Sequence, residues 1–189
     1  YVESGSGEPL IVLHGLFGAL SNFKDVFSHF SGRFRVIIPM LPIYELPMLQ
    51  TSAKHLSEHI EGFVDEMGLD KVHLLGNSLG GHVGLIFTKN NLHRVASLSL
   101  TASSGLYENA FGNSFPRRED KTFIRDKVAV TFFDPKHATE ELVDECFEAV
   151  NSREKVLRIL AIAKSAIRHN MAKDLPAMTC PVCLIWGRN

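Results

Sequence analysis

A serine between two glycines is the residue of this 189-residue sequence whose setting most clearly predicts chemistry. Gly76-Asn77-Ser78-Leu79-Gly80 directly follows the apolar run at residues 72–75 and directly precedes an apolar helical pattern. A Gly-x-Ser-x-Gly motif in this context places the serine on a sharp turn, and the glycines leave room for a strained backbone. We therefore predict that Ser78 is a nucleophile and that Gly76 and Gly80 support it.

A nucleophile that attacks a carbonyl also needs donors for the oxyanion that develops. The helix that begins after Ser78 directs free amides and its positive dipole end at this position, so we predict the Leu79 N–H as one donor. The run His14-Gly15-Leu16-Phe17-Gly18 follows the first clear strand, at the edge where open α/β sheets bind ligands. We predict the Leu16 N–H as the second donor.

The neighbours of Leu16 are predicted to shape this oxyanion loop. Gly15 and Phe17 flank the donor in the sequence. His14 comes immediately after a strand, where a buried and hydrogen-bonded histidine is more common than a proton shuttle. We therefore interpret His14 as a supporting residue and not as the general base.

Two other motifs compete with the serine. His55-Leu56-Ser57-Glu58-His59 matches the H-x-x-E-H pattern of a zinc peptidase. However, Leu56 belongs to an apolar helical stripe, the two histidines and Glu58 lie beside or opposite it, and no third ligand is evident. Cys180-Pro181-Val182-Cys183 runs into a strand and does not open a helix, which favours packing over redox or metal chemistry. We predict neither a metal nor an organic cofactor.

The elements that must position these residues alternate along the chain. Short apolar runs predict strands at residues 10–13, 34–38, 72–75, 95–100 and 182–186. Helical periodicity predicts helices at residues 23–30 with Ser21 as N-cap, at 53–67 ending before Gly68, and from Ser78 to residues 90–91. This alternation is typical of an α/β fold with a mostly parallel sheet and helices on both faces.

The alternation breaks after Thr101, and roughly seventy residues precede the last strand, which is too long for an ordinary connection. Helical patterns recur there at Leu142, Cys146 and Val150, and again after Asn151 and Glu154, which predict a capping pair. We therefore predict a core at residues 1–104, a helical cap at 105–175 and a return to the core at 176–189. Six aromatic residues of the cap could line a pocket or form its own core: Phe111, Phe115, Phe123, Phe132, Phe133 and Phe147.

Composition excludes several classes of function. Twenty basic and 21 acidic residues give a net charge of -1, without the basic excess that nucleic-acid binding requires. No apolar run reaches the ~18 residues of a membrane span. Three cysteines cannot all pair, and no secretory signal is evident, so we expect a cytoplasmic protein without membrane or nucleic-acid partners.

Taken together, the motifs resemble those of the α/β-hydrolase family. The resemblance rests on the lead-in at Gly7-Glu8-Pro9-Leu10, the loop at residues 14–18, the serine motif and the closing run at residues 184–189. It implies a three-layer fold with a helical cap inserted before the last strand, and a small-molecule ester or carbonyl substrate. The closest members are carboxylesterases and hydrolases that cleave carbon–carbon bonds of ring-fission products. A homodimer is a candidate assembly.

The resemblance also implies a triad in the order Ser, Asp, His. Members that end this strand with Trp-Gly-Arg-Asn usually carry the catalytic Asp next, so the acid is expected directly after Asn189 and the histidine further on; we expect the sequence to be truncated. Serine in the motif argues against dehalogenases and epoxide hydrolases, which attack with a carboxylate. A non-catalytic relative that keeps the pocket as a small-molecule binding module remains an alternative.

Overall fold

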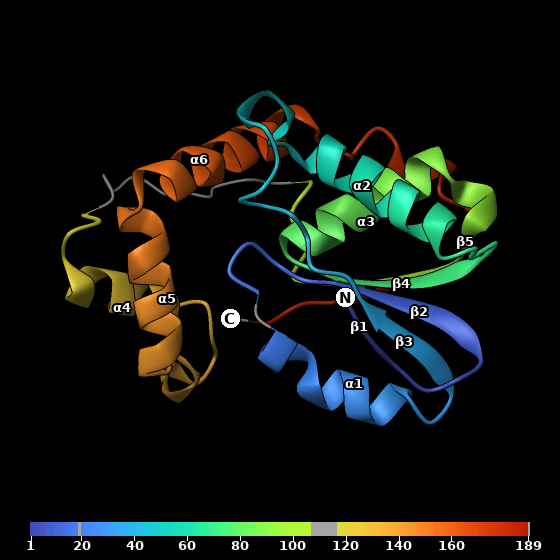
Figure 1. The fold of residues 1–189 in the computed structure, drawn as a ribbon, viewed down its shortest axis with the longest axis horizontal. Coiled ribbons are helices and arrows are strands. Elements are labelled where there is room, and N and C mark those ends of the chain that lie inside the picture. The colour runs from blue at the N-terminus through green and yellow to red at the C-terminus, as the bar shows by residue number, and fades with distance from the viewer. Residues whose placement is uncertain (19, 107–116, 189) are drawn as a thin grey trace.

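The fold is built on a six-stranded sheet that is parallel except at one edge (Figure 1). The computed structural model describes residues 1–18, 20–106 and 117–188. The strand order is β1-β3-β2-β4-β5-β6, and only β1 pairs antiparallel, with β3. The strands are β1 (Val2–Ser4), β2 (Glu8–Leu13), β3 (Phe34–Ile38), β4 (Val72–Asn77), β5 (Val95–Thr101) and β6 (Val182–Ile185).

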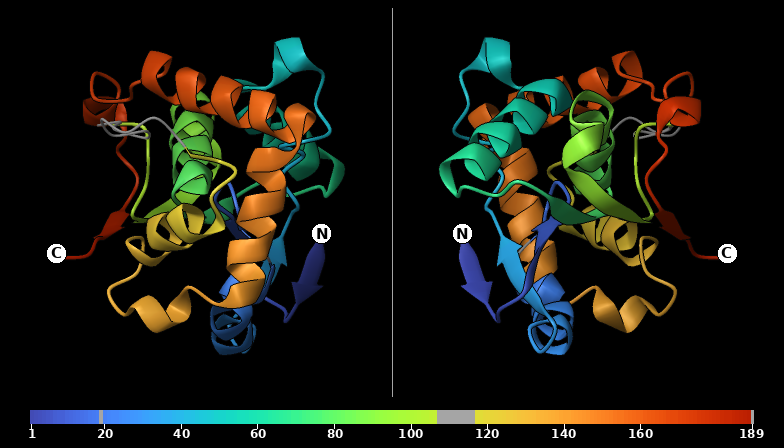
Figure 2. Two further views of the ribbon diagram at one scale, coloured as in Figure 1. Left: turned by 90° about the vertical axis from the view of Figure 1, so that its left-hand side faces the viewer. Right: turned by 90° about the vertical axis from the view of Figure 1, so that its right-hand side faces the viewer.

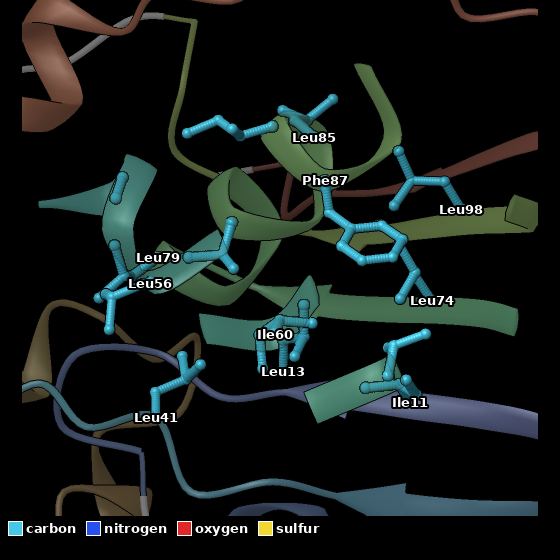
Figure 3. Close-up of a cluster of buried hydrophobic side chains, with 14 of the residues drawn as sticks. Ile11, Leu13, Leu41, Leu56, Ile60, Leu74, Leu79, Leu85, Phe87 and Leu98 are labelled. Atoms are coloured by element: carbon cyan, nitrogen blue, oxygen red, sulfur yellow. The ribbon is translucent and has the colours of Figure 1, made fainter. Parts of the chain in front are cut away.

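Helices cover both faces of this sheet, because successive strand residues point to opposite sides. Ile11 and Leu13 of β2 pack in the cluster that includes side chains of α2 (Ala53–Glu66) and α3 (Leu79–Asn90) (Figure 3). Leu10 and Val12 point the other way and pack near α1 (Lys24–Phe30). Figure 1 shows α1 on one face and α2 and α3 on the other, which confirms the predicted layers.

Helix α3 is buried along most of its length, from Leu79 to Thr88. A helix that is apolar all round belongs inside a protein, and α3 lies between the sheet and the segments outside it. Its glycine at position 84 has Leu98 of β5 only 3.4 Å from where a Cβ would stand. The helix that follows the serine motif is therefore held rigidly against the sheet.

In the described part of the segment between β5 and β6, the chain forms the α-helices α4 (Lys121–Ala129), α5 (Glu140–Asn151) and α6 (Arg153–Arg168). Helices α4 and α5 share a small core made by Ile124, Val128, Val143 and Cys146, whereas Ile162 of α6 belongs to the main core. Figure 1 shows α5 to one side of the sheet, and Figure 2 shows α6 running across the end of α2 and α3. Helices α5 and α6 match the helical patterns of the sequence, whereas no pattern predicted α4, and the range 105–175 of the cap stays a prediction.

Short 3-10 turns complete the described chain: η1 (Leu20–Phe23), η2 (Met48–Gln50), η3 (Leu92–Arg94), η4 (Pro135–His137) and η5 (Leu175–Ala177). Among the described helices, none combines the length and the apolar composition needed to cross a membrane.

All five predicted strands are confirmed, whereas two predicted helix starts are wrong. Helix α1 begins at Lys24 with Phe23 as its N-cap, because Ser21 falls inside the 3-10 turn that precedes it. Helix α6 is capped by Ser152, whose hydroxyl accepts from the Lys155 N–H, and not by Asn151. Asn151 instead ends α5, so the break between the two helices lies one residue further along than predicted.

Candidate active site at the carboxyl edge of the sheet

Ser78 occupies a strained turn between β4 and α3. Its φ is 52° and its ψ is -117°, a backbone conformation that non-glycine residues rarely adopt. A Cβ at Gly76 would lie 2.5 Å from the Gly81 Cα, and one at Gly80 would lie 2.1 Å from the Leu13 carbonyl oxygen. The motif has glycine at both places because a side chain at Gly76 would overlap the backbone of the same turn, and one at Gly80 would overlap the end of β2.

The loop after β2 lies directly beside Ser78. A Cβ on Gly15 would stand 3.3 Å from the Ser78 Cβ and 3.3 Å from the Asn77 Oδ1. The Gly18 N–H donates to the Gly15 carbonyl at 3.0 Å, which closes a tight turn over residues 15–18. The predicted oxyanion loop and the predicted nucleophile thus meet, although they are more than 60 positions apart in the sequence.

Both predicted oxyanion donors belong to the two segments that lie side by side here, the loop after β2 and the start of α3. Leu79 is the first residue of α3, where a backbone N–H has no acceptor within the helix. Leu16 sits inside the turn that Gly15 and Gly18 close, and that turn uses the N–H of Gly18. The arrangement is compatible with two converging amides, and their role as donors stays a prediction.

His14 holds the oxyanion loop in place through both nitrogens of its ring. The Leu41 N–H donates to Nε2 at 2.9 Å, and Nδ1 lies 2.8 Å from the Gly15 carbonyl oxygen. The ring is neutral in this arrangement, with its proton on Nδ1. Burial lowers the pKa of His14, and the hydrogen bond to Gly15 opposes that effect. These contacts agree with a supporting role, joining the loop to the chain that follows β3.

The loop after β5 also reaches the serine, which the sequence analysis did not predict. Ala102 has a φ of 43°, a second non-glycine residue in the left-handed region. The Ser104 N–H and hydroxyl both donate to the Ser78 carbonyl, at 3.1 and 3.3 Å. The Ser103 side chain would lie 2.4 Å from a Cβ on Gly81. No local pattern marks these residues, because only the pairing of β4 with β5 brings them to the turn.

His82, one turn into α3, connects the serine's helix to the inserted helices. Its side chain is fully buried, and Nε2 lies 2.8 Å from the carbonyl oxygen of His169, just after α6. The Met171 N–H donates to the Gly105 carbonyl at 2.7 Å, which binds the same segment to the loop after β5. The end of the insert is thus fixed close to the candidate site.

In the described part of the chain, no histidine is hydrogen-bonded to the Ser78 hydroxyl. His14 and His82, which belong to the elements around the turn, are each hydrogen-bonded to backbone groups.

A cavity of about 580 Å³ opens beside the oxyanion loop. Its walls come from that loop, from residues 40–45 after β3, from His59 of α2 and from the inserted helices α5 and α6. Phe17 links the two sides, since it packs on the small core of the inserted helices and also lines the cavity. A second cavity of about 400 Å³, almost wholly apolar, lies between α3, β5, β6 and η5 and includes Ser103 and Ser104 in its wall.

The aromatic residues predicted in the cap mostly pack among themselves. Phe123, Phe132 and Phe147 pack against the small core of the inserted helices, and Phe133 is 89% exposed. None of these four lines the cavity beside the oxyanion loop. The remaining two, Phe111 and Phe115, lie outside the described residues.

The competing motifs have structural explanations. His55 Nδ1 lies 2.7 Å from the Ser52 hydroxyl, while Glu58 forms an ion pair with Lys54 at 3.4 Å. Among the described residues, no group of three His, Cys, Asp or Glu side chains is arranged to hold a metal ion. Cys180 packs on the main core, and burial raises its pKa, which disfavours the reactive thiolate.

A hydrogen-bonded Ser–His–Glu series lies at the amino-terminal ends of the parallel strands, away from the candidate site. His73 Nδ1 lies 2.8 Å from the Ser97 hydroxyl, and its Nε2 lies 3.1 Å from Glu8 Oε2. The order resembles a triad, but Ser97 sits within β5, next to a register shift, without the strained turn and helix start that Ser78 has. The contacts join the amino-terminal parts of β2, β4 and β5, which supports a structural role.

Comparison with known proteins identifies the family. Residues 8–162 match the α/β hydrolase fold family, so the chain belongs to that family. The solved structure of an α/β hydrolase enzyme from the metagenome of Mar Chica lagoon sediments, Morocco, superposes with a TM-score of 0.79 at 42% identity, covering 100% of this chain and 71% of the other. The fold predicted from the motifs is therefore confirmed.

Curated relatives have more than one activity. The chain is 30% identical over 194 residues to the dihydrolipoyllysine-residue acetyltransferase component of the acetoin cleaving system of Pseudomonas putida, over 96% of this chain and 51% of that protein. It is 28% identical over 212 residues to 2-hydroxy-6-oxononadienedioate/2-hydroxy-6-oxononatrienedioate hydrolase 1 of Dechloromonas aromatica, over 100% of this chain and 73% of the relative. The chain thus spans about half of the first protein and about three quarters of the second.

Proposed function

We propose that the protein is a serine hydrolase that cleaves a carboxylic ester or a related carbonyl substrate through an acyl-enzyme on Ser78. The observation that carries this proposal is the positive φ of Ser78, held between β4 and α3 by contacts that admit only glycine at positions 76 and 80. Strain of this kind in a non-glycine residue is associated with functional sites.

In the proposed reaction, Ser78 Oγ attacks the carbonyl carbon and its proton passes to a general base. The Leu79 and Leu16 amides hold the oxyanion while the C–O bond to the leaving alcohol breaks, and the base returns the proton to that alcohol. Water then attacks the acyl group, which releases a carboxylic acid and restores the hydroxyl. The family resemblance implies that this base is a histidine oriented by an aspartate. Neither a metal nor an organic cofactor is required for these steps.

The inserted helices are proposed to act as a cap over the substrate. They supply Glu145, Glu148, Ala149 and Lys155 to the cavity beside the oxyanion loop, so substrate in that cavity would lie between the core and the insert. Phe17 of the oxyanion loop packs against the small core of the inserted helices, so it would connect the sheet domain with the cap. Cavities at such boundaries exclude water, and their walls determine which substrates an enzyme accepts.

Cleavage of a carbon–carbon bond in a ring-fission product is the second candidate. The relative from Dechloromonas aromatica, which matches the full length of this chain, is named as a hydrolase of 2-hydroxy-6-oxo dienedioates. Such a reaction would use the same serine motif and the same amides, and the substrate alone would separate the two activities.

The test uses the full-length protein and three measurements. Ser78→Ala should lower kcat for p-nitrophenyl acetate or butyrate by at least about a thousandfold, because no nucleophile remains. A fluorophosphonate should add its mass to Ser78 and not to the variant. Ser28→Ala, which changes an exposed serine of α1, should retain full activity.

The same preparations separate the candidates. Turnover of a 2-hydroxy-6-oxo dienoate that exceeds turnover of the esters would favour carbon–carbon hydrolysis. Unchanged turnover in Ser78→Ala, or no covalent labelling, would contradict a serine hydrolase. Binding of small carbonyl compounds without turnover would favour the binding module.

A further inference from the structure

The cavity beside the oxyanion loop has an apolar floor and a charged rim. Leu16, Leu41 and Ile43 contribute apolar side chains, and the last two are nearly fully buried. The rim carries three carboxylates and one ammonium group, from residues that are all exposed: Glu45, Glu145, Glu148 and Lys155. The acidic groups come from two separate segments, the loop after β3 and helix α5, so the rim carries more negative than positive side chains.

Lys155 offsets one of the three negative charges of the rim but is not paired with any of the glutamates in the described structure. Lys155 Nζ lies over the Tyr44 ring, 5.4 Å from its centroid. Among the described residues, none of the three glutamates forms an ion pair. Glu45 Oε2 accepts only the Tyr44 N–H, at 3.1 Å.

The pKa values of Tyr44 and Cys146 also reflect the negative charge of the rim. Burial raises the pKa of Tyr44 to about 12, with further contributions from Cys146 and Glu45. Burial also raises the pKa of the Cys146 thiol to about 11, with a contribution from Glu145. In both cases a rim glutamate adds to the cost of placing a second negative charge nearby.

We propose that Glu45, Glu145 and Glu148 make this cavity select substrates whose distal end is uncharged or cationic and reject those that carry a distal carboxylate. The inference rests on the proposed function and specifies its substrate class: an ester or ketone with an apolar chain for the floor and no anion at the rim. Like charges at an exposed rim repel through water, so the discrimination should be moderate and should weaken with added salt.

The experiment compares two substrates of equal length with the full-length protein. The mono-p-nitrophenyl ester of glutaric acid carries a distal carboxylate, and its methyl ester is neutral. At low ionic strength, kcat/KM should favour the neutral ester by on the order of tenfold, and the ratio should fall several-fold in 0.5 M salt. In the double variant Glu145→Gln/Glu148→Gln the ratio should fall several-fold without salt.

A matched control removes the same number of charges elsewhere. Glu119→Gln/Glu141→Gln alters two exposed glutamates that do not line the cavity, one of them on α5, and should keep the wild-type ratio. An equal preference for both esters in the wild type, or equal ratios in both double variants, overturns the inference.

Binding to Ser78→Ala separates this inference from the proposed function. Calorimetric dissociation constants of the two esters should show the same preference without any chemistry, and equal affinities would overturn the inference even for an active enzyme. If wild-type turnover does not depend on Ser78 but the binding preference persists, the proposed function fails while the charge selectivity stands.

Discussion

At the candidate site, the residue type allowed at several positions is limited by how close the surrounding backbone lies. Gly80 is the clearest case, because a methyl group there would overlap the carbonyl of Leu13 and the carbonyl oxygen of His14. Backbone atoms in a sheet cannot move aside as a side chain can. The site and the stability of the sheet are therefore coupled at this residue.

Gly80→Ala should lower the free energy of unfolding by about 3 kcal/mol or more, since overpacking against fixed atoms is costly. Gly62→Ala is the matched control: Gly62 lies within α2 with no atom within 4 Å of its Cβ position. That variant should gain about 0.5–1 kcal/mol from helix propensity. Urea unfolding of both variants checks the pair, and equal effects would contradict the argument.

His14 should make stability depend on pH. Because burial lowers its pKa in the folded protein below the ordinary value of 6.5, the unfolded chain takes up the proton first as the pH falls. The stabilisation is therefore complete above about pH 6.5 and is lost progressively below it. Unfolding measured at pH 7.5 and pH 5 should show a smaller loss in His14→Gln, which retains an acceptor but does not titrate. His93→Gln, an exposed histidine, should behave as wild type.

At the residue scale the sequence predicted the serine motif and the oxyanion loop, because both are marked by local glycine spacing. It did not predict Ala102, Ser103 or Ser104. Their relation to Ser78 depends on the register of β4 with β5, in which Asn77 lies opposite Thr101. Such a register is set by tertiary packing and leaves no local signature.

The secondary-structure elements were predictable where periodicity was long, and not at their ends. Strands β2 to β5 carry buried apolar side chains and were found, whereas β1 spans only Val2–Ser4, has no fully buried residue and has no apolar alternation. At α6, Asn151 and Ser152 are both good N-caps, and sequence alone does not choose between them. The choice follows from Asn151 bonding back to the Phe147 carbonyl of α5.

One buried hydrogen bond joins the inserted helices to the core. The hydroxyl of Ser165 in α6, fully buried, accepts from the Ala53 N–H at the start of α2, at 2.8 Å. Ser165→Ala should lower the free energy of unfolding by about 1–3 kcal/mol, because that N–H then has no acceptor. Lys164→Ala, at the neighbouring exposed position, should change it by no more than about 0.5 kcal/mol. Chemical denaturation measures both, and similar losses would refute the assignment.

At the scale of the whole molecule, the more exposed of the two edge strands of the described sheet is β6. Every residue of β6 is exposed, including Leu184 at 64%, and among the described residues its outer edge has no partner strand. An apolar edge strand is a template for pairing with another chain.

The 189-residue chain alone should therefore associate as its concentration rises. Leu184→Lys should reduce this association by placing a charge on the edge. Leu49→Lys should not, because Leu49 is 96% exposed but lies in η2, away from the sheet. Light scattering across a concentration series measures the mean mass, and a constant monomer mass for the unaltered chain would disprove this expectation.

The pairing of β5 with β6 also has a consequence for how the chain folds. Leu98 lies opposite Val182, with the whole of α4, α5 and α6 between them in the sequence. Closing so long a loop lowers the entropy of the chain, and only the contacts of the completed strand pair offset that loss. Contacts between residues so far apart in the sequence slow folding. Strands β2 to β5 have much shorter connections. We therefore expect β6 to join the sheet late, after the inserted helices have condensed and shortened the distance it must bridge.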